Sequence, residues 1–520
     1  MMLFKNATFV SCEDENKVFS VMGVDKGKII CCADEIPDTF KNSPTIDLKG
    51  KCVLPAFADT HIHFESFALF NATIDVRDAK NFKDMAKIYS KYEKANPKVK
   101  FIPAFGCCAH TVEEKRLPNK DDLDKITSLP TLIVKYDGHA GVANTALLNQ
   151  LPKEVIKDEG FDRDTGWMYQ NAFYLGVNYI TQKVSPLSIL SGLISASDFM
   201  AKKGIALIHN VEGVGYKNDI DVDTIILAAK ALPQTFRIFF QTMDIDKVIK
   251  RKLPRIGGCF RLALDGCFGS EDAALLEPYN NDPNNKGFLT YSQEQVNEFC
   301  IKANRAGLQI SIHGIGDAAV EQALNAYEAA LKDYPRKDHR HIIIHANLMS
   351  EEMQEKAAQL GVLIATQPAF LYWEHEPQDY LDNLLGKERA AAIMPLKSWI
   401  EKGIKVSAGS DSPCTIPNPI EGIHYSCNHP NPNESISVLD ALRMHTSWAA
   451  YTSFDEKERG MLKEGMIADF VVLDKNPLEV PVNQLKNLNV ENIYFAGNKY
   501  EKPISGALPL IIKALLTKKK

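Results

Sequence analysis

Several features that would place this chain in a familiar class are missing from its 520 residues. No apolar stretch approaches the roughly 18 residues that are needed to cross a bilayer. Residues 1–7 lack the basic and then apolar layout of a secretory signal. Basic and acidic residues are nearly balanced, at 60 and 66, and are spread along the chain without an electrostatic footprint for nucleic acid. We therefore expect a cytoplasmic protein without a nucleic-acid or membrane partner, and leave a homo-oligomer open.

Cysteine pairs with the spacing of a metal clip are also missing. The 11 cysteines are an odd number and are scattered along the chain. Where two adjoin, at positions 31–32 and 107–108, they are neighbours rather than the ends of a Cys-x-x-Cys segment. We therefore expect free thiols in a reducing compartment, mostly buried as small hydrophobic side chains.

The two ends of the chain share a pattern that the middle lacks. Residues 1–55 alternate short β-rich runs with turn residues, and the same pattern returns at 469–474 and 490–498. This arrangement predicts that the ends, residues 1–55 and 455–520, meet in one small β-sandwich domain.

The middle, residues 56–454, alternates short apolar strands with amphipathic helical segments. Eight strands predict an α/β fold of the (β/α)8 TIM-barrel type, in which chemistry takes place at the carboxyl ends of the strands. The first strand ends at residue 63, and the others are expected at 205–211, 236–242, 259–265, 308–313, 342–347, 362–368 and 405–411. A long gap, from about 66 to 200, contains strands of its own and is interpreted as an insertion over the barrel mouth.

The first strand ends in two imidazoles, His61 and His63. Side chains alternate along a strand with a period of two, so both rings point to the same face. Such a pair can chelate a divalent cation, and nitrogen ligands favour zinc or a similar metal. Taken alone, the pair could equally cap a strand and form hydrogen bonds nearby.

Three further strands end in residues that can also bind a metal: the imidazoles of His313 and His345 and the carboxylate of Asp411. A single His at the end of an apolar strand is more often structural. Five such residues at the same topological position of a barrel predict a metal site.

Short motifs recur along nearly the whole chain. They are LPAFADTHIH at 54–63, DGH at 137–139, LDG at 264–266, HGIGD at 313–317, HA at 345–346, QP at 367–368, SAGSDSP at 407–413 and LKEGMIADFVVL at 462–473. Together these motifs resemble the amidohydrolase superfamily and, within it, the group called amidohydrolase family 3 or YtcJ-like.

The resemblance implies a metal-dependent hydrolase that cleaves an amide, or another C–N or ester bond, of a small organic molecule. In such enzymes a metal polarises the carbonyl and lowers the pKa of bound water from about 15.7 to about 7, so that hydroxide attacks. Asp411 matches the carboxylate that binds metal, takes the proton from water and can pass it to the leaving amine.

One position departs from the pattern. Many family members carry a lysine on strand 4 that is carboxylated and bridges two metals, and the matching residue here is Arg261. Arginine stays protonated, and its fixed charge repels a second dication. The prediction is one zinc ion per chain, with His345 beside the bound water. The predicted ligands are His61, His63, His313 and Asp411.

Candidate substrate residues are harder to place. His139 and Asp137, in the insertion, are expected to reach the substrate, and His139 also the developing oxyanion; a structural role for His139 in a turn is equally compatible. Tyr372 and Trp373 belong to an aromatic run after strand 7, where barrel enzymes place specificity residues. The same run could pack beneath the insertion.

Two other functions stay open. A deaminase of a heterocyclic or amino-substituted ring would share the one-metal site, but the glutamate that follows the strand-5 His in those enzymes is missing, and Asp317 lies four residues on. A catalytically silent binding protein on the same fold is the other alternative. The intact set of metal ligands argues against it.

Overall fold

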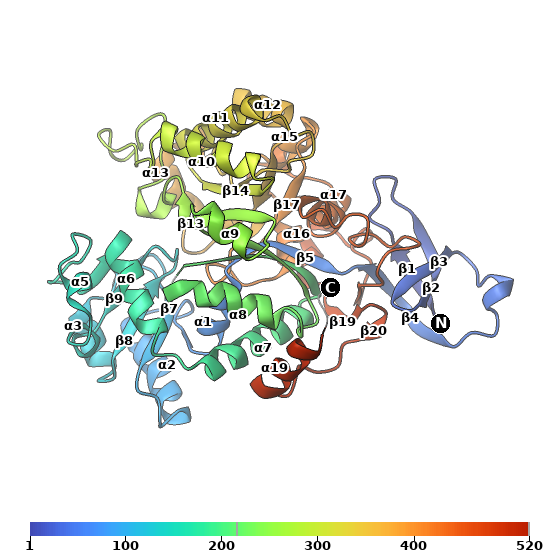
Figure 1. The fold of residues 1–520 in the computed structure, drawn as a ribbon, viewed down its shortest axis with the longest axis horizontal. Helices are drawn as coiled ribbons and strands as arrows, with labels where there is room; N and C mark the ends of the chain where they lie inside the picture. Colours follow the sequence, from blue (N-terminus) through green and yellow to red (C-terminus); the bar gives the residue numbers. More distant parts are fainter. Residues whose placement is uncertain (215–216, 518–520) are drawn as a thin grey trace.

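The computed structural model describes residues 1–214 and 217–517, except for the side chains of residues 217, 260 and 261. Its centre is a sheet of eight strands that are paired in parallel in chain order (Figure 1). The strands are β5 (Phe57–Ile62), β11 (Ile205–Glu212), β12 (Thr235–Phe240), β13 (Arg255–Ala263), β14 (Gln309–Gly314), β15 (Ile342–His345), β16 (Leu363–Thr366) and β17 (Val406–Ala408). The predicted (β/α)8 barrel is thereby confirmed.

Helices cover the outside of this sheet. They are α1 (Phe64–Asn71), α7 (Pro186–Lys202), α8 (Ile220–Ala228), α9 (Ile245–Lys250), α10 (Gln293–Arg305), α11 (Asp317–Asp333), α12 (Glu351–Leu360), α13 (Gln378–Leu385), α14 (Lys387–Ala391), α15 (Leu396–Glu401), α16 (Pro419–Cys427), α17 (Val438–Met444) and α18 (Ser447–Thr452). Helix α19 (Ala507–Leu516) follows the sheet of the chain ends and contacts α7 and α8. The strands are apolar on both faces because each face is covered. In β15, for example, Ile343 packs in the main core under the helices, whereas Ile342 and Ile344 join a separate cluster inside the barrel.

The barrel closes where the loop after β17 meets the end of β5. The N–H of Asp411 donates to the carbonyl of His61 over 2.8 Å, and the N–H of His63 donates to the carbonyl of Ser412 over 3.0 Å. Gly409 permits this approach, because a Cβ at that position would lie only 2.4 Å from the backbone nitrogen of His61. Barrel closure itself therefore brings Asp411 to the two imidazoles.

The two chain ends build one seven-stranded sheet in the order β20-β19-β18-β4-β1-β2-β3, which confirms a β-domain made from both ends. It combines β1 (Met2–Val10), β2 (Val18–Asp25), β3 (Lys28–Ala33) and β4 (Thr45–Pro55) with β18 (Phe470–Leu473), β19 (Val490–Phe495) and β20 (Asn498–Lys499). Phe4, Phe470 and Tyr494 pack together in its core, with ring centroids 4.4–5.3 Å apart. The long strand β4 runs directly into β5 and so joins this sheet to the barrel.

The segment between β5 and β11 carries a third sheet, of five strands in the order β10-β9-β8-β7-β6. Its elements are β6 (Ile74–Asp75), α2 (Phe82–Ala95), β7 (Ile102–Cys107), α3 (Lys120–Ile126), β8 (Thr131–Lys135), β9 (Ala140–Ala143), α4 (Thr145–Leu148), α5 (Lys153–Ile156), β10 (Trp167–Tyr169) and α6 (Gln170–Thr181). In Figure 1 this insertion and the sheet of the chain ends lie on opposite sides of the barrel. The sheet of the chain ends therefore does not separate the insertion from the barrel.

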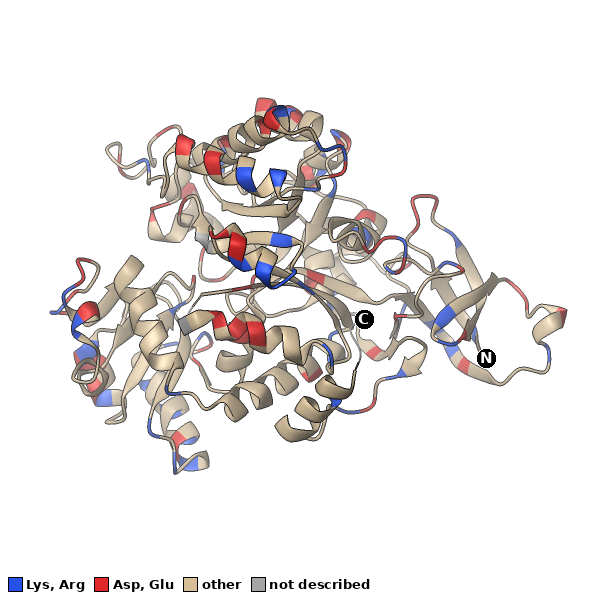
Figure 2. Cartoon of the chain, viewed as in Figure 1, with Lys and Arg blue, Asp and Glu red and all other residues tan. Residues whose placement is uncertain are grey.

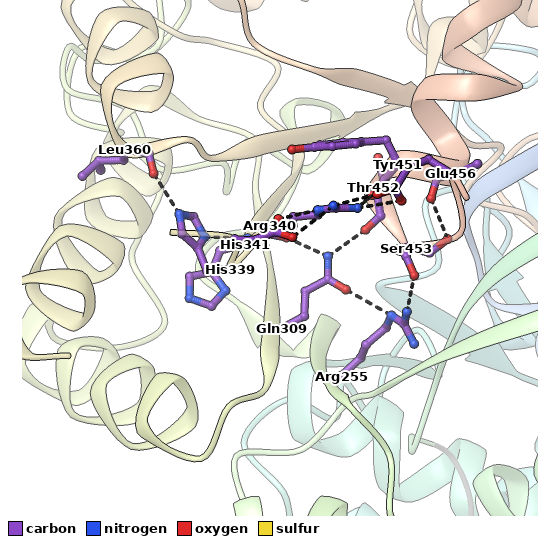
Figure 3. Close-up of polar contacts among 12 residues, drawn as sticks. Arg255, Gln309, His339, Arg340, His341, Leu360, Tyr451, Thr452, Ser453 and Glu456 are labelled. Carbon is purple, nitrogen blue, oxygen red and sulfur yellow. Dashed lines mark hydrogen bonds and ion pairs between the residues drawn. The ribbon is translucent and has the colours of Figure 1, made fainter. Parts of the chain in front are cut away.

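A network of hydrogen bonds and ion pairs connects the amino ends of β13, β14 and β15 (Figure 3). The amide of Gln309, at the start of β14, donates to the carbonyls of Arg340 and Thr452 over 2.7 and 2.8 Å and accepts from Arg255 over 3.0 Å. The guanidinium of Arg340 pairs with Glu456 and lies over the ring of Tyr451. In (β/α)8 barrels this end serves stability, and chemistry uses the opposite end.

The surface carries both charge signs on the outer helices and loops (Figure 2). Among the described residues, no single helix is long and apolar enough to cross a membrane. Helices α6 and α7 reach that length and composition only as a pair, which is bent by 103°.

Candidate metal centre

Two imidazoles and a carboxylate meet at the carboxyl end of β5. The Nε2 atoms of His61 and His63 lie 3.1 and 3.3 Å from the same carboxylate oxygen of Asp411. All three residues are buried, with at most 8% of their surface exposed. The structure thus brings together three residues that the sequence predicted as metal ligands.

A buried carboxyl group, Asp59, holds this arrangement in place. One of its oxygens accepts from the N–H of Ser410 over 2.9 Å and from the N–H of His61 over 3.3 Å, so it ties the β17 loop to β5. Burial raises the pKa of Asp59 to about 7, although these hydrogen bonds oppose the rise. Asp411 adopts a left-handed backbone with φ of 53°, a conformation that Asp tolerates better than most residues.

The other two predicted imidazoles lie beside this group. The ring centroids of His313 and His345 are 4.6 Å apart, and those of His61 and His345 are 5.6 Å apart. His345 Nδ1 lies 2.6 Å from the side-chain oxygen of Gln367 and must donate to it. This contact fixes the tautomer of His345 and leaves the lone pair of Nε2 available as a ligand.

His313 is oriented in the same way but through the opposite nitrogen. Its Nε2 lies 3.2 Å from the carbonyl of Gly266 and 3.3 Å from Asp265, so Nε2 carries the proton. Its Nδ1 is buried and has no hydrogen-bond partner within the described part of the chain. A buried, unpartnered lone pair of this kind suits a metal ligand.

Sequence reasoning missed one member of the cluster, Cys259. Its Sγ lies 3.1 Å from His61 Nε2 and 3.6 Å from His345 Nε2. Sequence periodicity gave no signal for it, because the predicted strand begins at Cys259 and the chemistry of a barrel lies at the carboxyl ends of its strands. The side chain of Arg261 lies outside the described residues, so the argument for one metal stays a prediction.

The cluster provides ligand atoms in two overlapping groups. One consists of His61, His63, Cys259 and Asp411, the other of Cys259, His313 and His345, and within each group the donor atoms lie within 4.8 Å of one another. Nitrogen, oxygen and sulfur donors at such separations fit a divalent metal of the zinc type. The residues present therefore fit the metal that the sequence implied.

The protonation states of the imidazoles and the carboxylate also suit a metal. Burial lowers the pKa of His61 and His345, so both rings are neutral. Burial alone would raise the pKa of Asp411, but hydrogen bonds from His61 and His63 outweigh it and lower this pKa well below its usual value. Neutral imidazole and ionised carboxylate are the forms that ligate a cation.

A cavity of about 110 Å³ opens above this cluster. Its walls are mainly apolar and come from both the insertion and the barrel loops. They include Phe70, Phe105, Val134, Phe173, Phe370 and Trp373. Trp373, which the sequence predicted as a substrate contact, therefore lines the cavity above the donor cluster.

Two predicted residues of the insertion reach the cavity but differ in their surroundings. His139 lines it, with its ring centroid 6.2 Å from that of His313. Asp137 also lines it, but its carboxylate already pairs with Lys135 over 2.7 Å and accepts from Ser270 over 2.9 Å. The backbone N–H of His139 donates to the same carboxylate over 3.1 Å, so Asp137 fixes the turn that presents His139.

The structure does not bring Tyr372 to the cavity. This side chain is 49% exposed, and its hydroxyl donates to the carbonyl of Asn428. Asp317 also lies outside the cavity lining, where its carboxylate accepts from the N–H of Leu276 over 2.8 Å. Glu376, which was not expected, does line the cavity, and burial raises its pKa to about 7.

The barrel, its buried donor cluster and the cavity above it define the class of metal-dependent hydrolases. The model of the amidohydrolase family matches residues 44–499, and the chain belongs to this family. It is similar to YtcJ of Bacillus subtilis (strain 168), assigned by its name to the amidohydrolases, at 28% identity over 88% of this chain and 90% of that protein.

One further relative and one solved structure are similar to most of the chain. An N-substituted formamide deformylase of Arthrobacter pascens is 22% identical over 96% of this chain and 98% of its own. An uncharacterized metal-dependent hydrolase of Pyrococcus furiosus has the same fold, with a TM-score of 0.74 at 24% identity over 92% of this chain and all of that one.

Proposed function

We propose that this protein hydrolyses an amide, or a related non-peptide C–N bond, of a small apolar molecule with the help of one zinc ion. The proposed ligands are His61, His63, His313 and Asp411. The observation that carries the proposal is the convergence of these buried donors at the base of an apolar cavity.

The metal would supply Lewis acidity, which polarises a carbonyl and lowers the pKa of water to about 7. The residues of the chain have separate tasks. The carboxylate of Asp411 accepts the proton that the attacking water loses and passes it to the nitrogen of the leaving amine. His345, held by Gln367, stands beside the water, and His139 donates to the oxygen on which charge develops.

The cavity favours an uncharged substrate. Among its described lining residues there is no Lys or Arg. The nearby Lys135 is already paired with Asp137. A substrate carboxylate held between the apolar walls, away from the metal, would thus be buried without a partner, which is costly. The Arthrobacter relative is named for the deformylation of N-substituted formamides, which are amides, and this supports amide hydrolysis here.

The test uses zinc-loaded protein and three probes: N-benzylformamide, its 4-carboxylate derivative and an aminotriazine. We expect equal amounts of formate and benzylamine from the first probe. The carboxylate derivative should react at least about tenfold more slowly, because an unpaired buried charge costs more than 1.4 kcal/mol. Metal content is measured on the same samples.

The aminotriazine separates hydrolysis of an amide from deamination. Release of ammonia from this ring, without any amide hydrolysis, would replace the proposal by the deaminase alternative. Failure of metal-loaded protein to act on a wider panel of aromatic N-acyl amines would contradict the proposal and favour a binding protein.

A further inference from the structure

The position of Cys259 sets it apart from the other cysteines. It is buried in β13, and its Sγ lies 3.1 Å from His61 Nε2 and 3.6 Å from His345 Nε2. Of the 11 cysteines, all of which fall in the described part of the chain, it is the one that belongs to a donor group. Cys414, which also lines the cavity, belongs to neither group.

The backbone before Cys259 has an unusual conformation, which accompanies the approach of the Cys259 sulfur to His61 and His345. Gly257 and Gly258 both have positive φ, at 115° and 144°. A Cβ at Gly257 would lie 1.8 Å from the carbonyl oxygen of Ser311, and one at Gly258 would lie 2.5 Å from the side chain of Gln241. Only glycine fits at these two positions. Beyond them the pairing of β13 with β14 shifts register, as at a bulge that re-aims a side chain.

The chemistry of the group is that of a four-ligand site. His61, His63 and Asp411 offer two nitrogens and one oxygen, and Cys259 adds a sulfur within 4.8 Å of all three donor atoms. Thiolate is a strong ligand for zinc and other borderline metals. His313 belongs to the neighbouring group, so sulfur rather than its imidazole is the fourth donor closest to these three.

We propose that the Cys259 thiolate is a direct ligand of the metal held by His61, His63 and Asp411. On binding, the thiol S–H bond is broken, its proton passes to solvent, and a sulfur lone pair forms the bond to the metal. This inference rests on the metal of the proposed function and revises its ligand set: Cys259 takes the fourth position that the proposal gave to His313, whose imidazole belongs to the neighbouring donor group. It does not depend on which bond the enzyme cleaves.

The test is spectroscopic and needs no substrate. Metal-free protein is loaded with one equivalent of Co²⁺, and the near-ultraviolet sulfur-to-cobalt charge-transfer band is recorded together with the visible cobalt bands. The wild type and Cys414→Ser should both show the charge-transfer band. Cys259→Ser should lose it and bind Zn²⁺ at least about 10–100-fold more weakly, since loss of even an outer-shell partner has that effect.

A measurement on the wild type covers the case in which Cys259→Ser fails to fold. X-ray absorption of the zinc-loaded protein should show a sulfur neighbour at about 2.3 Å beside nitrogen and oxygen neighbours at about 2.0–2.1 Å. A shell of nitrogen and oxygen alone would overturn the proposal, as would an undiminished charge-transfer band in Cys259→Ser. Absence of hydrolysis with the sulfur shell present would instead reject only the proposed function.

Discussion

The buried ion pair between Lys135 and Asp137 allows a sharp test of how the insertion presents His139. The Lys135 ammonium lies 2.7 Å from the Asp137 carboxylate, and their side chains are only 12% and 3% exposed. Replacing Lys135 by Met leaves a buried carboxylate that keeps Ser270 but has lost its counter-charge. Breaking a buried pair from one side typically costs about 3–5 kcal/mol. In a chain of this size we expect Tm to fall by roughly 3–5 °C.

The pH dependence of this loss follows from the pKa of Asp137. Burial alone would raise this pKa, but Lys135 and the N–H of His139 outweigh it, so the folded protein holds the pKa below its usual value. A depressed carboxyl pKa stabilises the fold above the unfolded value of about 3.9, and this contribution is lost as pH falls. In Lys135→Met the folded pKa rises instead, so the difference from wild type should shrink between pH 7 and pH 5.

The assay is thermal unfolding of three proteins across this pH range. The double variant Lys135→Met with Asp137→Asn removes the unpaired charge and should recover much of the stability at pH 7. A single variant as stable as the wild type at pH 7, or a double variant no better than the single, would refute the electrostatic reasoning. Turnover on the same samples shows whether a loosened turn at His139 also slows catalysis.

Three further outcomes are expected from the proposed site. Elemental analysis of protein purified without chelators should find one divalent metal per chain; two tightly held equivalents would show that the second donor group also fills and would remove the argument from Arg261. Asp411→Asn should lower turnover by about 10²–10⁴-fold, the loss typical of a general base, and near-normal turnover on a wild-type substrate would exclude that role. His139→Ala should keep its metal and lose about 10²–10³ in turnover, whereas His61→Ala should lose the metal itself; full activity in His139→Ala would take this residue out of the site.

The barrel and the convergence of its imidazoles with Asp411 were predictable from the sequence, because the order of strands and helices determines both. Parallel strands that alternate with helices present their carboxyl ends at one face, so His61, His313 and Asp411 had to converge once the eight strands were recognised. The distances among them depend on barrel closure. Closure rests on the backbone hydrogen bonds that join Asp411 and Ser412 to β5 and on the close approach that Gly409 permits, and periodicity reveals neither.

Loops and a distorted strand account for what sequence reasoning missed. Trp373 reaches the cavity and its neighbour Tyr372 faces solvent, because the short 3₁₀ turn at Pro368–Tyr372 sends adjacent side chains in different directions. No strand or helix period applies there. Cys259 was grouped with buried structural thiols, since its approach to His61 depends on the register shift in β13.

The sheet shared by the two chain ends has a consequence for synthesis. Strand β4 is made early, but its neighbour β18 comes much later, so that Cys52 bonds to Asn476, a residue 424 positions further on. At about 5–20 residues per second, translation of that stretch takes roughly 20–80 s. Throughout this time one edge of β4 has no partner, and such an edge invites pairing with other chains. The segment that leaves the ribosome first is therefore among the last to complete its sheet.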